Sequence, residues 1–288
     1  MLLPPMRRLP GYAWLGLAVL IVSEAGMLLA LEPFHTFHTP IAWTGYIFLV
    51  DGLVWKRRGE SWLRSAPAEL LFVAIFSIPL WLVFEFYNLF ILNWHYVGLP
   101  ENPWLALTGY AWSFATIWPA IFETGDLVSS LRDRRAPPAR FASRERCTRL
   151  SGAQWLSMAA GAAMLAWPIV WPSPYLAAPV WLGFIFLLDP LNARLGGEAL
   201  LCDLGHGRFS RAVNLAWAGL ICGVVWEFWN YWAGAKWIYT VPILADWKIF
   251  EMPVPGYLGF PAFALECFTM YITLRLFLWR GAGRAISI

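Results

Sequence analysis

The sequence predicts an all-α integral membrane protein with eight transmembrane helices, arranged as two parallel four-helix repeats. Three observations support this prediction: the composition, the placement of the basic residues and an internal duplication. Of the 288 residues, 59% are hydrophobic and only 14% are charged, and 20 are tryptophan. An ordinary soluble domain has about a quarter of its residues charged. The composition therefore excludes a soluble enzyme, a disordered chain and a nucleic-acid-binding module, and makes the lipid bilayer the expected surroundings.

The apolar stretches give the number of spans. A helix needs about 20 mostly apolar residues to cross the hydrocarbon core. Helices are expected because a spanning segment must satisfy its own backbone, and no alternating barrel pattern is present. The first stretch follows two arginines, as in a signal peptide, but no small-residue cleavage site follows, so we expect it to be retained. The stretches, of which the second and sixth are short, are 11–31, 40–55, 69–93, 104–129, 154–172, 176–193, 212–233 and 255–279.

The basic residues predict the orientation of these spans. Short cytoplasmic connections carry an excess of Lys and Arg. If both termini are cytoplasmic, 19 of the 21 basic residues lie on the inner side, and only Lys236 and Lys248 lie outside. A count shifted by one span would break this alternation. We therefore expect a multi-pass protein of the bacterial inner (cytoplasmic) membrane with both termini cytoplasmic.

The two halves of the chain resemble each other. WTGYIFLVDGL (43–53) matches WLGFIFLLDPL (181–191) at seven of eleven positions, and further matching blocks follow in the same order. Ordered self-similarity of this kind indicates an internal repeat. The further blocks are FEFYN (84–88) with WEFWN (226–230), Trp94-x-Tyr96 with Trp237-x-Tyr239, Gly109-Tyr110 with Gly256-Tyr257, and PAIFE (119–123) with PAFALE (261–266).

The repeat predicts the symmetry of the fold. Each half holds four spans, an even number, so both halves have the same orientation in the membrane. Parallel repeats of this kind are related by a pseudo-two-fold axis along the membrane normal. We expect a first repeat over 1–131, an Arg-rich cytoplasmic linker over 132–150 and a second repeat over 151–288.

Two matched pairs of polar residues lie inside predicted spans. Glu85 and Asn88 are three residues apart, as are Glu227 and Asn230, so each carboxylate shares a helix face with an amide. Ionisable groups are costly in the membrane and usually face the bundle interior or a cavity. One interpretation is an acid–base or ligand-orienting site. The other is that Glu and Asn tie helices together, and for Asn88 and Asn230 the two interpretations have equal weight.

Further carboxylates are expected near the same depth. Glu266 lies ten residues after Gly256, which places it about 15 Å deep at about 1.5 Å per residue, level with Glu227. Glu123 lies one turn deeper on a similar face, and Glu24 has no counterpart in the second half. A carboxyl group in an apolar pocket can stay protonated and donate a proton. We therefore name Glu85, Glu227 and Glu266 as candidate catalytic residues, and Glu123 as a candidate ligand-binding residue.

Two other sets of polar residues are expected to be structural. Asp51 and Asp189 are matched at the inner ends of the short spans, and helix termination with an ion pair at the interface explains them best. His35 and His38 in FHTFHT have spacing that suits a metal, but no third ligand is evident nearby. No metal site is therefore expected.

Aromatic residues follow both Glu/Asn pairs. Trp94, Tyr96, Trp237 and Tyr239 lie at the outer ends of spans, where an interfacial aromatic belt explains most Trp and Tyr. Their recurrence beside the carboxylates also suits the wall of a site for an apolar, unsaturated or cationic ligand. Together with Asn88 and Asn230 they are named as candidate ligand-binding residues.

Trp226-Glu227, Trp237-x-Tyr239 and Phe260-Pro261 followed by Glu266 are similar to segments of the membrane lycopene cyclases of carotenoid synthesis. This resemblance implies that isoprenoid chemistry should be tested. The paired Glu-Glu expected of those enzymes is absent, so the chain is not assigned to that family. Motifs of nucleotide-binding, zinc-protease and serine-hydrolase sites are also absent from the sequence.

The sequence thus favours a membrane protein that binds a lipophilic small molecule, a lipid, isoprenoid or pigment-like compound, in a cavity between the repeats. Redox-neutral acid–base catalysis on that ligand is one form of this function. The first alternative is a non-catalytic structural or assembly subunit with membrane-protein partners. The second alternative is a small proton- or cation-coupled transporter. No nucleic-acid partner is expected, and the sequence identifies no cofactor.

Overall fold

The computed structural model describes residues 7–133 and 151–278, so most of the predicted linker 132–150 lies outside the described residues. Eight helices of this described part have 18 residues or more, and they coincide with the eight apolar stretches. Their bounds are α1 (Gly11–Leu28), α2 (His38–Arg58), α4 (Pro67–Ile91), α5 (Pro103–Arg132), α6 (Gly152–Val170), α7 (Ala177–Arg194), α9 (Ser210–Trp232) and α10 (Gly259–Leu278).

Six segments are long and apolar enough to cross a membrane, which makes this a multi-pass membrane protein. They are α1, α4, α5, α6, α9 and the segment Val254–Leu278, in which the 3-10 helix η2 (Val254–Leu258) leads into α10. α2 and α7 have 21 and 18 residues but are not apolar enough to qualify. The count of eight spans therefore stays a prediction.

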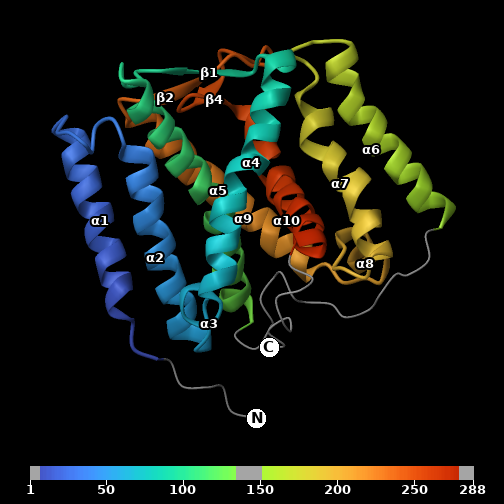
Figure 1. The fold of residues 1–288 in the computed structure, drawn as a ribbon, viewed down its shortest axis with the longest axis horizontal. Helices are drawn as coiled ribbons and strands as arrows, with labels where there is room; N and C mark the ends of the chain where they lie inside the picture. The colour runs from blue at the N-terminus through green and yellow to red at the C-terminus, as the bar shows by residue number, and fades with distance from the viewer. Residues whose placement is uncertain (1–6, 134–150, 279–288) are drawn as a thin grey trace.

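The long helices form one bundle with a central group and two flanking pairs (Figure 1). α4, α5, α9 and α10 lie at the centre, where α4 packs on α5, α9 packs on α10, and α5 packs on α9. α1 and α2 pack together on one side, and α6 and α7 on the other. α2 joins the centre through α5, whereas α7 joins it through α10.

Glycine allows each flanking pair to approach closely. A Cβ atom at Gly16 of α1 would lie 2.5 Å from the carbonyl oxygen of Gly45 in α2. A Cβ atom at Gly161 of α6 would likewise lie 2.7 Å from the carbonyl oxygen of Gly183 in α7. Small residues at such contacts let backbones touch, which is the main source of helix association where lipid removes the hydrophobic driving force.

A short helix follows each flanking pair at one end of the bundle: α3 (Trp62–Ser65) and α8 (Leu200–Gly205) (Figure 1). Asp51 Oδ2 accepts a hydrogen bond from the backbone N–H of Leu63 at 2.8 Å, and Asp189 Oδ1 accepts one from that of Leu200 at 2.7 Å. Each aspartate therefore satisfies a free N–H group at the start of the next helix. The structural role expected for both residues is consistent with these bonds, although no ion pair with Lys56 or Arg194 joins them in the described residues.

The opposite end of the bundle carries a two-stranded ribbon of β1 (Trp94–Val97) and β2 (Lys236–Tyr239) (Figure 1). The strands pair antiparallel, with Trp94 opposite Tyr239 and Tyr96 opposite Trp237. Residues directly opposite and residues two apart share a face of a sheet, so these four aromatic side chains project from the same face. A second small ribbon, β3 (Lys248–Ile249) with β4 (Met252–Pro253), lies beside it.

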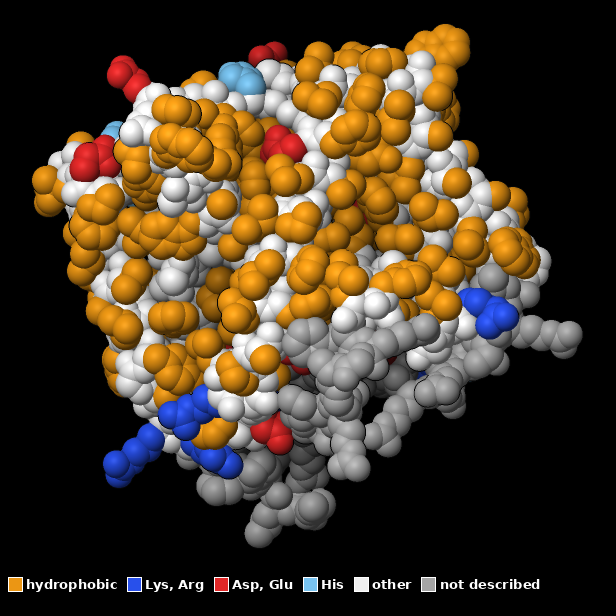
Figure 2. Space-filling view, in the orientation of Figure 1, with side chains coloured by type: hydrophobic (Ala, Val, Ile, Leu, Met, Phe, Trp, Pro, Cys, Tyr) orange, Lys and Arg blue, Asp and Glu red, His pale blue; other side chains and the backbone are white. Residues whose placement is uncertain are grey.

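The surface matches a protein embedded in lipid. Apolar side chains cover the middle of the face shown in Figure 2, and Lys and Arg side chains gather toward its lower end. The lipid-facing helices expose large apolar residues, as at Leu156 of α6, where the side chain is 71% exposed. An exposed apolar surface of this extent is expected only where a partner or the bilayer covers it.

The glycine contact predicts the effect of adding one methyl group. Gly16→Ala should lower the free energy of unfolding by about 1–3 kcal/mol, because the methyl group cannot fit without moving α1 from α2. Thermal unfolding in detergent measures this change. Gly11→Ala is the matched control, since a Cβ atom there has open space. Equal stability of the two variants would contradict the tight helix contact.

Candidate functional site

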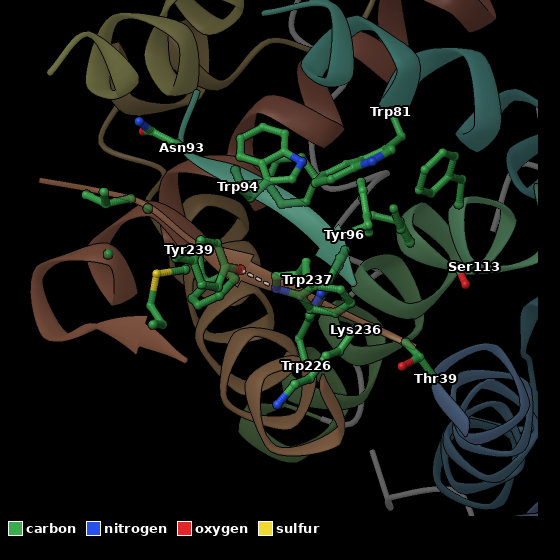
Figure 3. A pocket seen from close by; sticks show the side chains of 18 of the residues that line it. Thr39, Trp81, Asn93, Trp94, Tyr96, Ser113, Trp226, Lys236, Trp237 and Tyr239 are labelled. Atoms are coloured by element: carbon green, nitrogen blue, oxygen red, sulfur yellow. Dashed lines mark hydrogen bonds between the residues drawn. The ribbon is translucent and has the colours of Figure 1, made fainter. Parts of the chain in front are cut away.

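A cavity of about 530 Å³ lies under the ribbon, within the size range of small-molecule sites (Figure 3). Its walls come from β1 and β2, from one tryptophan each in the second halves of α4 and α9, and from the first halves of α2, α5, α7 and α10. Connecting segments complete the walls. Six tryptophans, four tyrosines and four phenylalanines line it, and Lys236 is the one charged side chain among its described lining residues.

Both halves of the chain contribute matching residues to this cavity. Trp43 and Trp181 come from the duplicated WTGYIF and WLGFIF blocks, and both line it. The four aromatic residues of the ribbon, predicted as ligand-binding residues, line it as well. Figure 3 shows Trp94 and Tyr96 on one strand and Trp237 and Tyr239 on the other, around the same space. Folding thus brings together aromatic residues that lie more than a hundred positions apart.

Glu85 anchors the aromatic side chains of the first half. Its Oε1 atom accepts hydrogen bonds from Trp81 Nε1 at 2.7 Å, from Trp94 Nε1 at 3.2 Å and from the Tyr96 hydroxyl at 2.5 Å. An ionised carboxylate is an acceptor without a proton of its own, so it suits a site where three donors meet. The carboxylate lies behind the rings and is not itself among the lining residues.

Glu227 has the matching position in the second half. The Tyr239 hydroxyl donates to Glu227 Oε1 at 2.8 Å, and Trp237 Nε1 donates to the Tyr239 hydroxyl oxygen at 2.8 Å. Glu227 is fully buried, and no group in the described part of the chain forms a hydrogen bond with its Oε2 atom. Each half therefore has one glutamate that orients a Trp-x-Tyr segment. In the first half, three donors bind the glutamate directly. In the second half, the Trp donates to the Tyr hydroxyl, and the Tyr hydroxyl donates to the glutamate.

The two strand tyrosines are held in the protonated form. Burial, reinforced by the Glu85 carboxylate, raises the pKa of Tyr96 well above its ordinary value. Burial and the Glu227 carboxylate do the same to the pKa of Tyr239. Each hydroxyl therefore stays a hydrogen-bond donor to its carboxylate across the physiological pH range.

Asn88 of α4 and Asn230 of α9 connect the ribbon to these helices by side-chain hydrogen bonds. Asn88 Nδ2 donates to the Trp94 carbonyl at 2.8 Å, and Asn88 Oδ1 accepts from the Trp94 backbone N–H at 3.3 Å. Asn230 makes the same two bonds to Trp237, both at 2.9 Å. Neither amide is among the lining residues, so a direct contact of either with a ligand stays a prediction without support from this geometry.

The remaining carboxylates lie away from the cavity wall. Glu266 is fully buried, and its Oε1 atom accepts a hydrogen bond from the backbone N–H of Phe184 at 3.1 Å. Its Oε2 atom has no partner within residues 7–133 and 151–278. Glu123 is fully buried in α5, and neither residue is among the described lining residues. Glu24 accepts from Trp229 Nε1 at 2.6 Å, next to the buried His38. Glu24, Glu85, Glu227 and Glu266 thus accept hydrogen bonds from different groups. That the candidate catalytic glutamates act together in one site stays a prediction.

Sequence reasoning missed several residues of this site. Trp81, Trp226 and Phe263 line the cavity, and so do Trp43 and Trp181, yet none was a candidate. The duplicated W-x-G block could have identified Trp43 and Trp181, because its Trp recurs at the same place in both halves. The pairing of β1 with β2 had no signal in the sequence beyond the repeated Trp-x-Tyr.

Comparison of the chain with models of known families, with curated proteins and with solved structures found no match. The described residues contain no group of three or more His, Cys, Asp or Glu placed to hold a metal ion. Interpretation of the site therefore depends on its geometry.

The asparagine contacts predict a structural penalty. Asn230→Ala should lower the free energy of unfolding by about 1–3 kcal/mol, because the backbone N–H and C=O of Trp237 lose their partners. Denaturation in detergent measures the change. A variant of normal stability that fails to retain ligand would instead place Asn230 in the binding site.

Proposed function

We propose that this membrane protein binds a lipophilic small molecule, a lipid, isoprenoid or pigment-like compound, in the aromatic cavity under the ribbon. The observation that carries the proposal is the cavity of about 530 Å³ with fourteen aromatic side chains on its wall. Ligand sites are concave and mostly apolar, with a few polar groups that set orientation. Burial of an apolar ligand here contributes about 25 cal/mol for each Å² removed from water.

The cavity also offers polar contacts to such a ligand. Thr39 Oγ1 is buried, lines the cavity and has no hydrogen-bond partner among the described residues. Ser113 lines the same side in Figure 3. A hydroxyl or carbonyl oxygen of the ligand would satisfy Thr39, whereas the rest of the wall favours apolar groups and flat unsaturated ones that stack on rings.

The proposal includes an architecture of eight crossings, with α2 and α7 among them, in two parallel repeats. Matched contacts support it: the glycine contacts of the flanking pairs, the two aspartates that cap α3 and α8, and the two asparagines that hold the ribbon. The ribbon supports it too, because its register pairs His95 with Ile238, the middle residues of the two equivalent segments. A two-fold axis through that pair exchanges the strands.

The proposed orientation places the ribbon on the outer side and α3 and α8 on the cytoplasmic side. Lys56, Arg57 and Arg58 end α2, and Arg194 ends α7, at the end of the bundle that carries α3 and α8. The positive-inside rule assigns that end to the cytoplasm. The cavity then opens toward the outer leaflet, and both termini are cytoplasmic.

The main proposal is tested by purification in a mild detergent and mass spectrometry of bound lipids, pigments and proteins. Ala262→Phe should lower the amount of bound ligand by about tenfold or more, because the added ring competes for space in the cavity. Ala163→Phe is the matched control, since Ala163 is exposed on α6 and is not a lining residue. Recovery of other proteins with no small molecule would favour the subunit alternative and contradict the proposal.

Acid–base catalysis on the bound ligand is a second candidate, favoured by the Tyr239–Glu227 hydrogen bond at the cavity wall. A proton could pass between ligand and carboxylate through one phenol hydroxyl. In D₂O, the wild type should then place deuterium on carbon in the ligand, and Glu227→Gln should do so about 10²-fold more slowly. Mass spectrometry of the recovered ligand measures the exchange, with Glu101→Gln as the control. Equal exchange in all three proteins, or none, would leave Glu227 as a positioning residue.

A further inference from the structure

The ionisable side chains around the end of the cavity nearest the ribbon are mostly acidic. The carboxylates of Glu85 and Glu227 lie directly behind the aromatic rings, and no basic side chain of the described residues pairs with either. Lys236, the charged lining residue, is already neutralised: its Nζ lies 3.1 Å from Glu251 Oε1 and 3.2 Å from the Tyr231 carbonyl oxygen. This end of the cavity therefore holds two acidic side chains and no free basic one among the described residues, so a bound cation would favour their ionised form.

The polar groups of the surrounding rings are already engaged. Trp81, Trp94 and Tyr96 direct their N–H and O–H groups to Glu85, and Trp237 and Tyr239 direct theirs toward Glu227. These side chains therefore contact a ligand through the carbon atoms of their rings. A donor bonded to an anion also makes its ring more electron-rich, because hydrogen-bonded groups polarise one another. Such rings attract cations that need no hydrogen-bond partner.

The rings lie close enough together to surround a small cation. The centroids of Trp81 and Trp226 are 5.7 Å apart, those of Trp226 and Trp237 are 5.5 Å apart, and those of Trp81 and Trp94 are 6.1 Å apart. The four strand aromatics share the face of the ribbon that looks into this space (Figure 3). Aromatic side chains from four elements thus meet at the end of the cavity nearest the two carboxylates.

We propose that the cavity selects a cationic amphiphile with a quaternary ammonium group, held against the ribbon aromatics while its hydrocarbon chain fills the rest of the cavity. This inference rests on the proposed function and specifies its ligand class. A quaternary ammonium has no N–H to satisfy, so the engaged donors cost it nothing. An anionic headgroup would meet two acidic side chains and no free cation among the described residues, and a neutral one would give neither acidic side chain a charged partner.

The test compares two ligands of the same shape. Decanoylcholine carries a trimethylammonium group, and 3,3-dimethylbutyl decanoate replaces that nitrogen by an uncharged carbon. Equilibrium dialysis against the protein in nanodiscs, with empty nanodiscs as the blank, gives both affinities. We expect decanoylcholine to bind at least about tenfold more tightly than its neutral isostere, the size of a desolvated cation–π contact.

Variants test whether the preference depends on the carboxyl groups of Glu85, which is partly buried, and Glu227, which is fully buried. Glu85→Gln and Glu227→Gln keep an acceptor oxygen for the rings and remove the ionisable group. Each should lower the affinity for decanoylcholine about tenfold more than it lowers the affinity for the neutral isostere. Glu101→Gln removes an exposed carboxylate on the same side of the bundle and should change neither. Retained binding of the isostere shows that a variant has folded.

The outcomes separate this inference from the proposed function. Equal binding of the two compounds by the wild type overturns the inference, while binding of the isostere still supports a lipophilic site. A preference for decanoylcholine that persists in both Gln variants also overturns it, because the charge behind the rings is then irrelevant. Absence of binding of either compound contradicts the proposed function as well.

Discussion

The antiparallel pairing of β1 with β2 is the contact on which the candidate site depends. Four aromatic side chains point from the ribbon toward the interior of the bundle, and each buried N–H or O–H group needs an acceptor. Glu85 accepts the bonds of Trp94 and Tyr96, and Glu227 accepts that of Tyr239, whose hydroxyl oxygen in turn accepts the bond of Trp237. Asn88 and Asn230 bind the strand backbone. Loss of any of these partners leaves polar groups unsatisfied where water cannot replace them.

This constraint explains why expensive residues recur in both halves. A glutamate inside a membrane helix is costly, yet here each one organises a Trp-x-Tyr segment from the helix that precedes it. The two halves converge on one cavity rather than two, because their strands pair with each other. A wall of large rings in place of aliphatic side chains gives this cavity electron-rich faces, with the acidic side chains of Glu85 and Glu227 behind them.

Much of this organisation can be predicted from the sequence, and some cannot. Apolar length identified all eight long helices within a few residues at most of their ends, because a bilayer imposes that length directly. The sequence similarity of the two halves identified Glu85, Glu227 and the four aromatic residues of the ribbon as candidates. It could not show that the carboxylates lie behind the rings, since helix spacing gives the face of a residue but not its partners. Only the fold brings Trp81, Trp226 and Phe263 to the cavity, because an aromatic residue of an apolar helix can equally well face the lipid.

The central claim is that a lipophilic molecule occupies the space beneath the ribbon, between the two halves. Photolabelling with a long-chain alcohol that carries an alkyl diazirine, followed by peptide mapping, tests it most directly. The account predicts labelled peptides from both 94–97 and 236–239, suppressed by Ala262→Phe, while labelling of the exposed face of α6 is unchanged. Labelling confined to exposed helix faces, with none on the ribbon, would contradict the account.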